Sequence, residues 1–439
     1  MQNQKGGIAL SLGILFLLFV VFMAISVPIA VTLGVVGLLP NFFDPSFPAN
    51  PQFVIRSMIG GVDSFPILAI PMFIFSGIIM AHGGISKKLF NMFSYFIGNK
   101  TAGLPCAVVI TCLFYGAISG SSPATTAAVG SMTIPLLVSL NYDKVFATAL
   151  VAVAGGLGVI IPPSIPFILY GMASGASVGK MFIAGILPGF LIGGCLMVYA
   201  YYYCKTKGED KEKLQEHYQA LKSQGFVTVF KDSFWALMAP VIILGSIYSG
   251  IASPTEAAVL SVFYALIVSL FIYKSTTFKD VVTMARESIN TYAPLLFILS
   301  AALAFARILT FMQAPQLAAT AITSVVSSKI GVLIVMNVLL LFVGMVMDGG
   351  PAILILTPIL LPIVTAVGVD PVHFGIIMVV NLAIGFVTPP IGINLFVASS
   401  MTGIEVTQIA RKALPFIVAF LLALIVITFV PELSLMLTR

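Results

Sequence analysis

Long apolar runs alternate with short polar segments along the whole chain. Runs of about 20 apolar residues predict transmembrane helices. The first such region, Gly7–Leu39, contains Pro28 and Gly34, so it is either two short spans or one tilted helix. Ser86–Gly98 instead sets lysines against leucine and phenylalanine, which predicts a helix lying at the membrane interface. Further apolar runs predict spans at 64–82, 181–203, 234–250, 254–273, 288–311 and 413–430, and an interfacial helix at 315–328.

Two polar interruptions lie inside apolar segments of the first half. Gly116–Thr126 is a turn rich in glycine and serine, and Gly158–Ser164 contains two adjacent prolines. Unpaired backbone groups cost several kcal/mol each where water is absent, so such breaks occur only where they are buried in protein or line a cavity. The first interruption therefore predicts a re-entrant helical hairpin at 103–140. The second predicts a discontinuous helix at 143–174.

Both interruptions recur in the second half of the chain. The second hairpin is predicted at 331–367, around Asp348–Pro351, and the second discontinuous helix at 371–401. Such duplication is typical of secondary transporters. At one offset of 227 residues, Pro135, Asp143, Gly158, Pro162, Pro163 and Pro188 match Pro362, Asp370, Gly385, Pro389, Pro390 and Pro415.

The sequence therefore predicts two repeats joined by a hydrophilic linker. The first repeat, 1–203, has scaffold helices at 7–98 and a closing span at 181–203. The linker is 204–232, and the second repeat, 233–439, has scaffold helices at 234–328 and a closing span at 413–430. Each repeat then crosses the membrane five times, and an odd number of crossings makes the two repeats inverted.

The distribution of basic residues tests this topology. With the linker inside, the inside carries 15 Lys and Arg residues and the outside carries 5. Basic residues concentrate on the cytoplasmic side, so the count favours a cytoplasmic linker and periplasmic termini. A single helix at Gly7–Leu39 would move the N-terminus to the inside.

Composition agrees with a polytopic all-α membrane protein. The chain is 59% hydrophobic and only 8% charged, whereas soluble domains carry about 25% charged residues. The net charge of +6 therefore reports membrane orientation and not nucleic-acid binding. The four cysteines lack metal-ligand spacing, and the chain has no phosphate-binding GxxxxGK[ST] motif that would indicate ATP use.

The interruptions supply groups for ion binding. Proline lacks an N–H and clashes with the carbonyl four residues earlier. The first proline pair should therefore free the carbonyls of Gly158 and Val159, and the second pair those of Gly385 and Phe386. Such carbonyls, with hydroxyls and a carboxylate, suit Na⁺. The tips, at Ser122-Pro123 and Gly350-Pro351, predict helix N-termini that favour anions. A cation site beside an anion site predicts Na⁺-coupled uptake of an organic acid anion.

Two Na⁺ sites are therefore predicted, with the substrate between the hairpin tips. The first Na⁺ site comprises Ser119, Gly120, Ser121, Ser122, Gly158, Val159 and Pro162. The second comprises Asp348, Gly349, Gly350, Gly385, Phe386 and Thr388. The predicted substrate contacts are Ser122, Thr125, Ser164, Thr388, Asn394 and Arg307.

Five polar residues have either a structural or a functional role. Asp143 and Asp370 fit helix N-caps better than ion ligands. Asp348 lies at a predicted tip, where a carboxylate within the membrane indicates function. Arg307 either extends to the outer interface, pairs with an acid or contacts the substrate. Glu256 lies near a predicted helix start, where it would cap the helix or contact another subunit.

Five motifs also carry a resemblance to a known family. They are Gly61–Phe75, Gly116–Thr126, Gly158–Ser164, Ser249–Ala257 and Gly385–Asn394. Together they resemble the large, DctM-like membrane subunit of tripartite ATP-independent periplasmic (TRAP) transporters. The resemblance covers nearly the whole chain. It implies an elevator-type importer of organic acid anions in the bacterial inner membrane, driven by two or more Na⁺ ions and without an organic cofactor.

The resemblance also implies two partner proteins. One is a small four-helix membrane subunit on a separate chain, and the other is a periplasmic substrate-binding protein. The family's substrates include C4-dicarboxylates and sialic acid, and the overall pattern resembles the sialic-acid branch. A passive anion channel and a stand-alone Na⁺/dicarboxylate symporter are the alternative functions.

Overall fold

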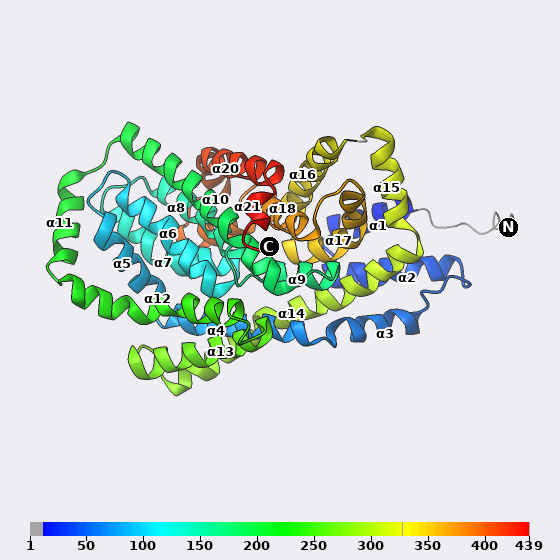
Figure 1. Cartoon of the computed structure of the whole chain (residues 1–439), viewed down its shortest axis with the longest axis horizontal. Coiled ribbons are helices and arrows are strands. Elements are labelled where there is room, and N and C mark those ends of the chain that lie inside the picture. Colours follow the sequence, from blue (N-terminus) through cyan, green and yellow to red (C-terminus); the bar gives the residue numbers. More distant parts are fainter. Residues whose placement is uncertain (1–11, 327, 439) are drawn as a thin grey trace.

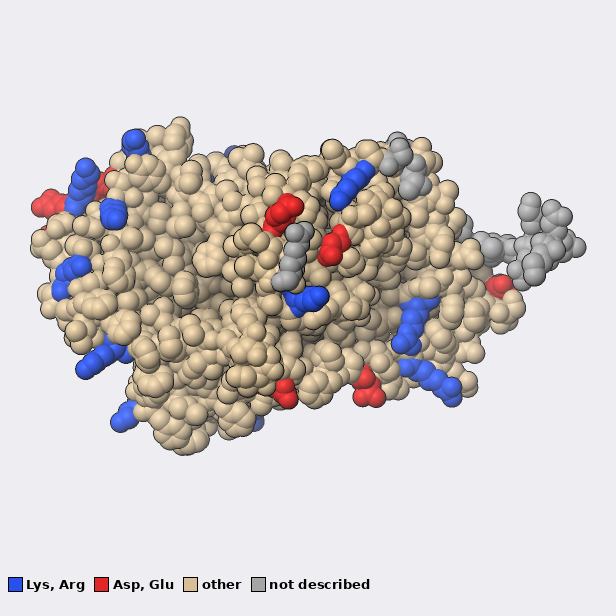
Figure 2. All heavy atoms as spheres, in the orientation of Figure 1, with Lys and Arg blue, Asp and Glu red and all other residues tan. Residues whose placement is uncertain are grey.

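The computed structural model describes residues 12–326 and 328–438, and all regular elements in this part of the chain are helices. Eight of the described helices are long and apolar enough to cross a membrane. Charged side chains are sparse on the face shown in Figure 2, with a group at the end formed by α11 (Lys211–Lys222). Large apolar side chains such as Leu17, Val198 and Phe342 are more than half exposed, as expected for contact with lipid. The prediction of a polytopic all-α membrane protein is confirmed.

The described part of the chain begins with two helices and not with one tilted helix. Ser26 has a φ of 64° and Pro28 follows it, so α1 (Leu12–Ala24) ends there and α2 (Ile29–Phe43) begins. Residues 7–11 of the predicted first span lie outside the described residues. The rest of the first half consists of α3 (Pro51–Val62), η1 (Phe65–Leu68), α4 (Ala69–His82), α5 (Ile85–Ile97), α6 (Gly103–Ser119), α7 (Ser122–Ser139), α8 (Lys144–Ala154), η2 (Gly155–Val159), α9 (Ile165–Ser174) and α10 (Val178–Lys207).

Helix α3 is an element that the hydropathy pattern did not predict. Asn50 caps it, because its Oδ1 accepts a hydrogen bond of 2.8 Å from Phe53 N, and Pro51 occupies the first turn. Asparagine followed by proline is a recognised helix start, so the signal was present in the sequence.

The second half follows the same order, with longer helices than predicted at two places. Helix α14 begins at Phe278 and not at residue 288, and α12 begins at Phe226, inside the predicted linker. The elements are α12 (Phe226–Tyr248), α13 (Pro254–Ile267), η3 (Val268–Ile272), α14 (Phe278–Phe311), α15 (Ala314–Val325), α16 (Lys329–Val346), α17 (Gly349–Ala366), α18 (Pro371–Gly385), α19 (Ile393–Thr402), α20 (Val406–Phe429) and α21 (Glu432–Leu435).

We divide the helices into two groups that pack against each other. The scaffold group comprises α2 to α5 and α12 to α14, in which α4 packs on α13 and α14 packs on α2, α3 and α4. The core group comprises α6 to α10 and α16 to α20, that is, both hairpins, both discontinuous helices and the two spans that follow them. Figure 1 shows α3, α4, α13 and α14 along one long edge of the molecule, beside the core group.

Close glycine contacts hold each hairpin against its own discontinuous helix. A Cβ on Gly116 would lie 2.8 Å from the Cα of Gly158, and a Cβ on Gly385 would lie 2.3 Å from the carbonyl carbon of Gly344. Neither backbone approach leaves room for a side chain, so both require glycine. Gly158 and Gly385 match at the offset of 227 residues, and Gly116 and Gly344 match within one residue of it.

Candidate transport site

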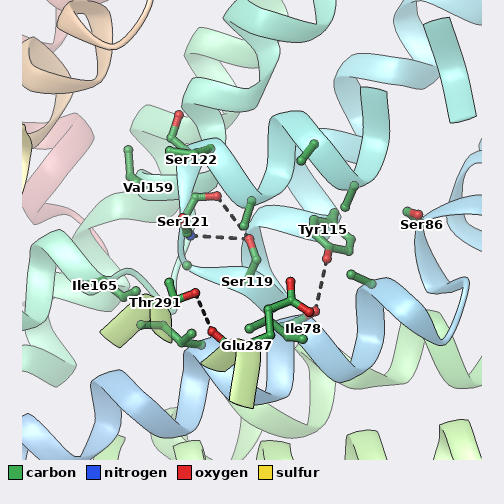
Figure 3. Close-up of a pocket in the computed structure, with 18 of the residues that line it drawn as sticks. Ile78, Ser86, Tyr115, Ser119, Ser121, Ser122, Val159, Ile165, Glu287 and Thr291 are labelled. Carbon is green, nitrogen blue, oxygen red and sulfur yellow. Dashed lines mark hydrogen bonds between the residues drawn. The ribbon is translucent and has the colours of Figure 1, made fainter. Parts of the chain in front are cut away.

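A cavity of about 780 Å³ lies between the scaffold group and the core group. The core group contributes residues from both hairpin tips and both helix breaks, among them Ser121, Val159, Asp348 and Phe386. Helices α4 and α14 of the scaffold group form the opposite wall, and Figure 3 shows Glu287 and Thr291 facing the first tip across the cavity. The structure therefore brings together four segments that the sequence places far apart.

Oxygen atoms crowd together at the predicted first Na⁺ site. Ser119 Oγ lies 2.9 Å from Thr125 Oγ1, which donates to Ser121 O at 2.8 Å. Gly158 packs against these groups, because a Cβ there would lie 2.3 Å from Thr125 Oγ1 and 2.7 Å from Ser121 O. The first tip and the first break are thus in direct contact through oxygen-bearing groups. Among the residues predicted for this site, Ser119, Gly120, Ser121, Ser122 and Val159 line the cavity.

The predicted second Na⁺ site is built around Asp348. Its Oδ1 accepts a hydrogen bond of 2.8 Å from Gly349 N, and the structure has no cationic side chain within 4 Å of the carboxylate among the described residues. Gly349 packs against the Phe386 ring, since a Cβ there would lie 3.1 Å from Cζ. Thr388 Oγ1 donates to Ile384 O at 2.7 Å. Asp348, Gly350 and Phe386 line the cavity.

Three of the carbonyls predicted to be free have hydrogen-bond partners. Val159 O accepts from Ser164 Oγ at 2.6 Å, and Phe386 O accepts from Asn394 N at 2.9 Å. Gly385 O accepts from Thr388 N at 3.1 Å. That part of the prediction was wrong, because Ser164 and Asn394 after the proline pairs, and Thr388 just before the second pair, supply donors to these carbonyls. A carbonyl oxygen has a second lone pair, so these groups are still able to contact a cation.

The N-cap predictions are confirmed for the two aspartates. Asp143 Oδ1 accepts from Phe146 N at 2.6 Å, and Asp370 Oδ1 accepts from Val372 N at 2.7 Å. The hairpin arms, however, begin earlier than predicted. The N-cap of α7 is Ser121 and not Ser122, and that of α17 is Asp348 and not Gly350. The following prolines fit inside the first turn, where backbone N–H groups lack helical partners.

Glu256 and Arg307 lie away from the cavity lining. Glu256 forms a capping box with Ser253, which confirms its role at a helix start. Arg307 is exposed, and its Nη1 donates to Ser57 Oγ of α3 at 3.3 Å. The structure therefore gives Arg307 a scaffold contact and does not bring it to the predicted substrate region.

The predicted substrate contacts separate into two kinds. Ser122 is fully buried and is part of the cavity lining. Thr125, Ser164 and Asn394 are also fully buried but lie outside the lining. Thr388 is partly exposed but also lies outside the lining. The buried polar side chains form internal hydrogen bonds, so they stabilise the conformation of the hairpin tips and the helix breaks.

Sequence reasoning missed the scaffold wall of the cavity. This wall includes His82 of α4, Ser86 and Lys87 of α5, and Glu287 and Thr291 of α14. Glu287 Oε2 lies 3.8 Å from His82 Nε2. These residues belong to ordinary helices without a break, so the sequence offered no signal that they meet the hairpin tips.

Comparison with known proteins places the chain in a family. Residues 16–433 match the family described as tripartite ATP-independent periplasmic transporter, DctM component. The chain is 46% identical over 420 residues to the isethionate TRAP transporter permease protein DctMQ of Oleidesulfovibrio alaskensis, and the match covers 96% of this chain. It covers 65% of that longer relative.

Two other relatives and one solved structure extend the comparison. The C4-dicarboxylate TRAP transporter large permease protein DctM of Pseudomonas aeruginosa is 40% identical over 85% of this chain and 86% of its own length. The sialic acid TRAP transporter large permease protein SiaM of Vibrio cholerae is 33% identical over 88% of this chain and 89% of its own length. The YdaH transporter structure of Alcanivorax borkumensis shares the fold, with a TM-score of 0.60, 16% identity and coverage of 94% and 97%.

These findings agree with the geometry of the cavity. An apolar helical body with broken helices around a cavity is the architecture of a secondary transporter and not of an enzyme. The family match covers more than nine tenths of the chain, including both hairpins and both discontinuous helices. The chain belongs to the DctM component family of tripartite ATP-independent periplasmic transporters.

Proposed function

We propose that the chain is the large membrane subunit of a Na⁺-coupled importer of a small organic anion. The observation that carries the proposal is the cavity in which both hairpin tips, both breaks and the Asp348 carboxylate meet. Asp348 has no cationic side chain within 4 Å among the described residues, and a carboxylate at membrane depth is costly without a compensating charge. The hydroxyl and carbonyl oxygens beside each break supply the ligand type that a Na⁺ ion requires.

The proposed substrate class rests on the names of the relatives and on their sequence identity to this chain. The relatives are named for isethionate, C4-dicarboxylates and sialic acid, which are all organic acid anions. Identity is 46% to the isethionate protein and 33% to the sialic acid protein, which favours a small sulfonate or carboxylate over a sugar acid. A tripartite family also supports two partners, a small membrane subunit and a periplasmic binding protein.

The proposed transport cycle moves the core group past the scaffold group. The cavity lies between these groups, so such a movement would carry both tips and their bound ions together from one side of the membrane to the other. The inverted repeats would supply the two end positions of this elevator-type movement.

The test is uptake by proteoliposomes that contain the chain, its small membrane subunit and its binding protein. Labelled isethionate, succinate and N-acetylneuraminate are offered under an inward Na⁺ gradient and, as control, an equal K⁺ gradient. Accumulation above the external concentration only with Na⁺ is the expected result. Downhill flux that ignores Na⁺ would replace the proposal with a passive anion channel.

A further inference from the structure

The cavity has a second polar region, at the end that adjoins the linker. Gly84, Ser86 and Lys87, around the start of α5, line the cavity there. The next residue, Lys88, identifies this end, because its Nζ lies 4.0 Å from Asp232 Oδ2 and its carbonyl accepts from Ser233 Oγ at 2.8 Å. The start of α5 therefore lies beside the first turns of α12, which begins inside the predicted linker.

Ser86 is a buried polar group that lacks an internal partner. Its exposed fraction is 6%, and its hydroxyl makes no hydrogen bond to any residue in the described ranges. Figure 3 shows the side chain on the cavity wall, apart from the cluster at the first tip. Ser86 lines the cavity, so its hydroxyl is free to hydrogen-bond a ligand there.

Two neighbouring features indicate that this ligand is negatively charged. Lys87 lines the cavity, and its ammonium group has no carboxylate within 4 Å in the described part of the chain. Helix α5 begins at Gly84 without a side-chain cap, so the N–H groups of its first turn remain available at the positive end of the helix. A lysine, a hydroxyl and an uncapped helix start together make an anion site.

The position of this region suggests when the anion would occupy it. The cavity follows α7 from Ser122 at the tip to Met132, a helical rise of about 15 Å. The neighbouring carboxylate of Glu287 lies 3.8 Å from the His82 ring on the same scaffold wall. An anion that leaves the tips toward the linker end therefore meets its next positive group at Lys87.

We infer that Gly84, Ser86 and Lys87 form an anion transit site on the scaffold group, which takes the carboxylate or sulfonate group of the substrate as it leaves the hairpin tips. This inference rests on the proposed function for the identity of the anion. It assigns the scaffold a direct contact with substrate, separate from the ion and substrate regions of the core group.

A chemical protection experiment tests binding without any transport. The purified protein is treated with an amine-acylating reagent, with and without about 10 mM isethionate or succinate. Chloride keeps the ionic strength constant at about 0.1 M, where the Debye length is about 10 Å, so electrostatic screening is the same in all samples. Mass spectrometry follows Lys87 and, as the matched control, Lys88. Acylation of Lys87 should slow at least threefold while Lys88 is unaffected. Equal acylation of Lys87 with and without both anions would overturn the inference.

A transport experiment separates this inference from the proposed function. Lys87→Gln and Ser86→Ala should lower the maximal uptake rate several-fold with little change in the half-saturating substrate concentration, whereas Lys87→Arg should retain most of the rate. Lys88→Gln, normalised for protein amount, is the control. Wild-type protein without Na⁺-driven uptake would refute the proposed function. Wild-type uptake with Lys87→Gln equal to Lys88→Gln would refute the transit site alone.

Discussion

Ser122 Oγ lies 2.7 Å from Nδ2 and 3.1 Å from Oδ1 of Asn394, although 272 residues separate the two positions. Asn394 Nδ2 also donates to Ala152 O at 2.9 Å. Both Ser122 and Asn394 are fully buried. One amide thus connects the first hairpin tip, the first discontinuous helix and the start of α19, so the two halves share a polar contact at the centre of the core group.

Replacement of this amide should destabilise the core group. Asn394→Leu leaves Ala152 O and Ser122 Oγ without this partner, which should lower the free energy of unfolding by about 1–3 kcal/mol. Ser122→Ala should cost less, because Asn394 keeps its bond to Ala152. Thermal unfolding in detergent measures both variants. The double variant should cost less than the sum of the two, and strict additivity would contradict a shared contact.

Asp348 should matter through its charge and not its size. In Asp348→Asn the predicted second Na⁺ site loses its carboxylate, so we expect uptake to lose most of its dependence on Na⁺ concentration. Asp143→Asn is the matched control, because Asp143 caps α8 and asparagine is also a good cap. That control should cost about 1 kcal/mol or less and keep the Na⁺ response. An unchanged Na⁺ response in Asp348→Asn would show that the second site is misplaced.

The glycine contact of the second half should not tolerate a methyl group. Gly385→Ala would place a Cβ 2.3 Å from the Gly344 carbonyl carbon, which should destabilise the protein by about 1–3 kcal/mol or more. Gly194→Ala provides a control within α10, where a Cβ has no atom within 4 Å. The control should be neutral or stabilising by up to about 1 kcal/mol, since alanine favours the helix. Equal thermal stability of the two variants would argue against the close backbone contact.

The membrane orientation is open to direct labelling. Ser223 lies at the end of α11 in the linker, whereas Lys180 lies at the start of α10, and both are exposed. A membrane-impermeant thiol reagent applied to intact cells should label Lys180→Cys and leave Ser223→Cys unlabelled, because the linker is expected in the cytoplasm. The parent protein gives the background from its four cysteines. Labelling of Ser223→Cys alone would invert the proposed topology.

Arg307 should be dispensable for substrate affinity. Its guanidinium is exposed and bonded to Ser57 on the scaffold group, away from the cavity lining. We therefore expect Arg307→Gln to leave the half-saturating substrate concentration within about twofold, a difference below 1 kcal/mol. Uptake measured over a range of substrate concentrations gives this value. A tenfold increase would restore Arg307 as a substrate contact.

The sequence was most informative where local chemistry breaks a helix. The proline pairs and the glycine-rich turn predicted the ends of α6 to α9 and α16 to α19 within a few residues, since a proline cannot continue a helix whatever surrounds it. The partners of the Val159 and Phe386 carbonyls could not be inferred in the same way. They depend on how the chain turns after each proline pair.

The scaffold wall was unpredictable for a different reason. Glu287 and Lys87 lie on uninterrupted helices about 200 residues apart, and only the packing of α14 and α5 beside the core group brings both to one cavity. Hydropathy describes one segment at a time, so it located the tips and not the surface that faces them.

The two glycine contacts also bear on how an ion gradient would do work in the proposed cycle. Each hairpin packs closely against the discontinuous helix of its own half. Within each half, the oxygens beside Gly158 or Gly385 are therefore already close together before an ion binds. Binding to such a preorganised pocket loses little conformational entropy. The free energy of ion binding is then left to shift the populations of the inward and outward positions, which is how a downhill ion would drive an uphill solute.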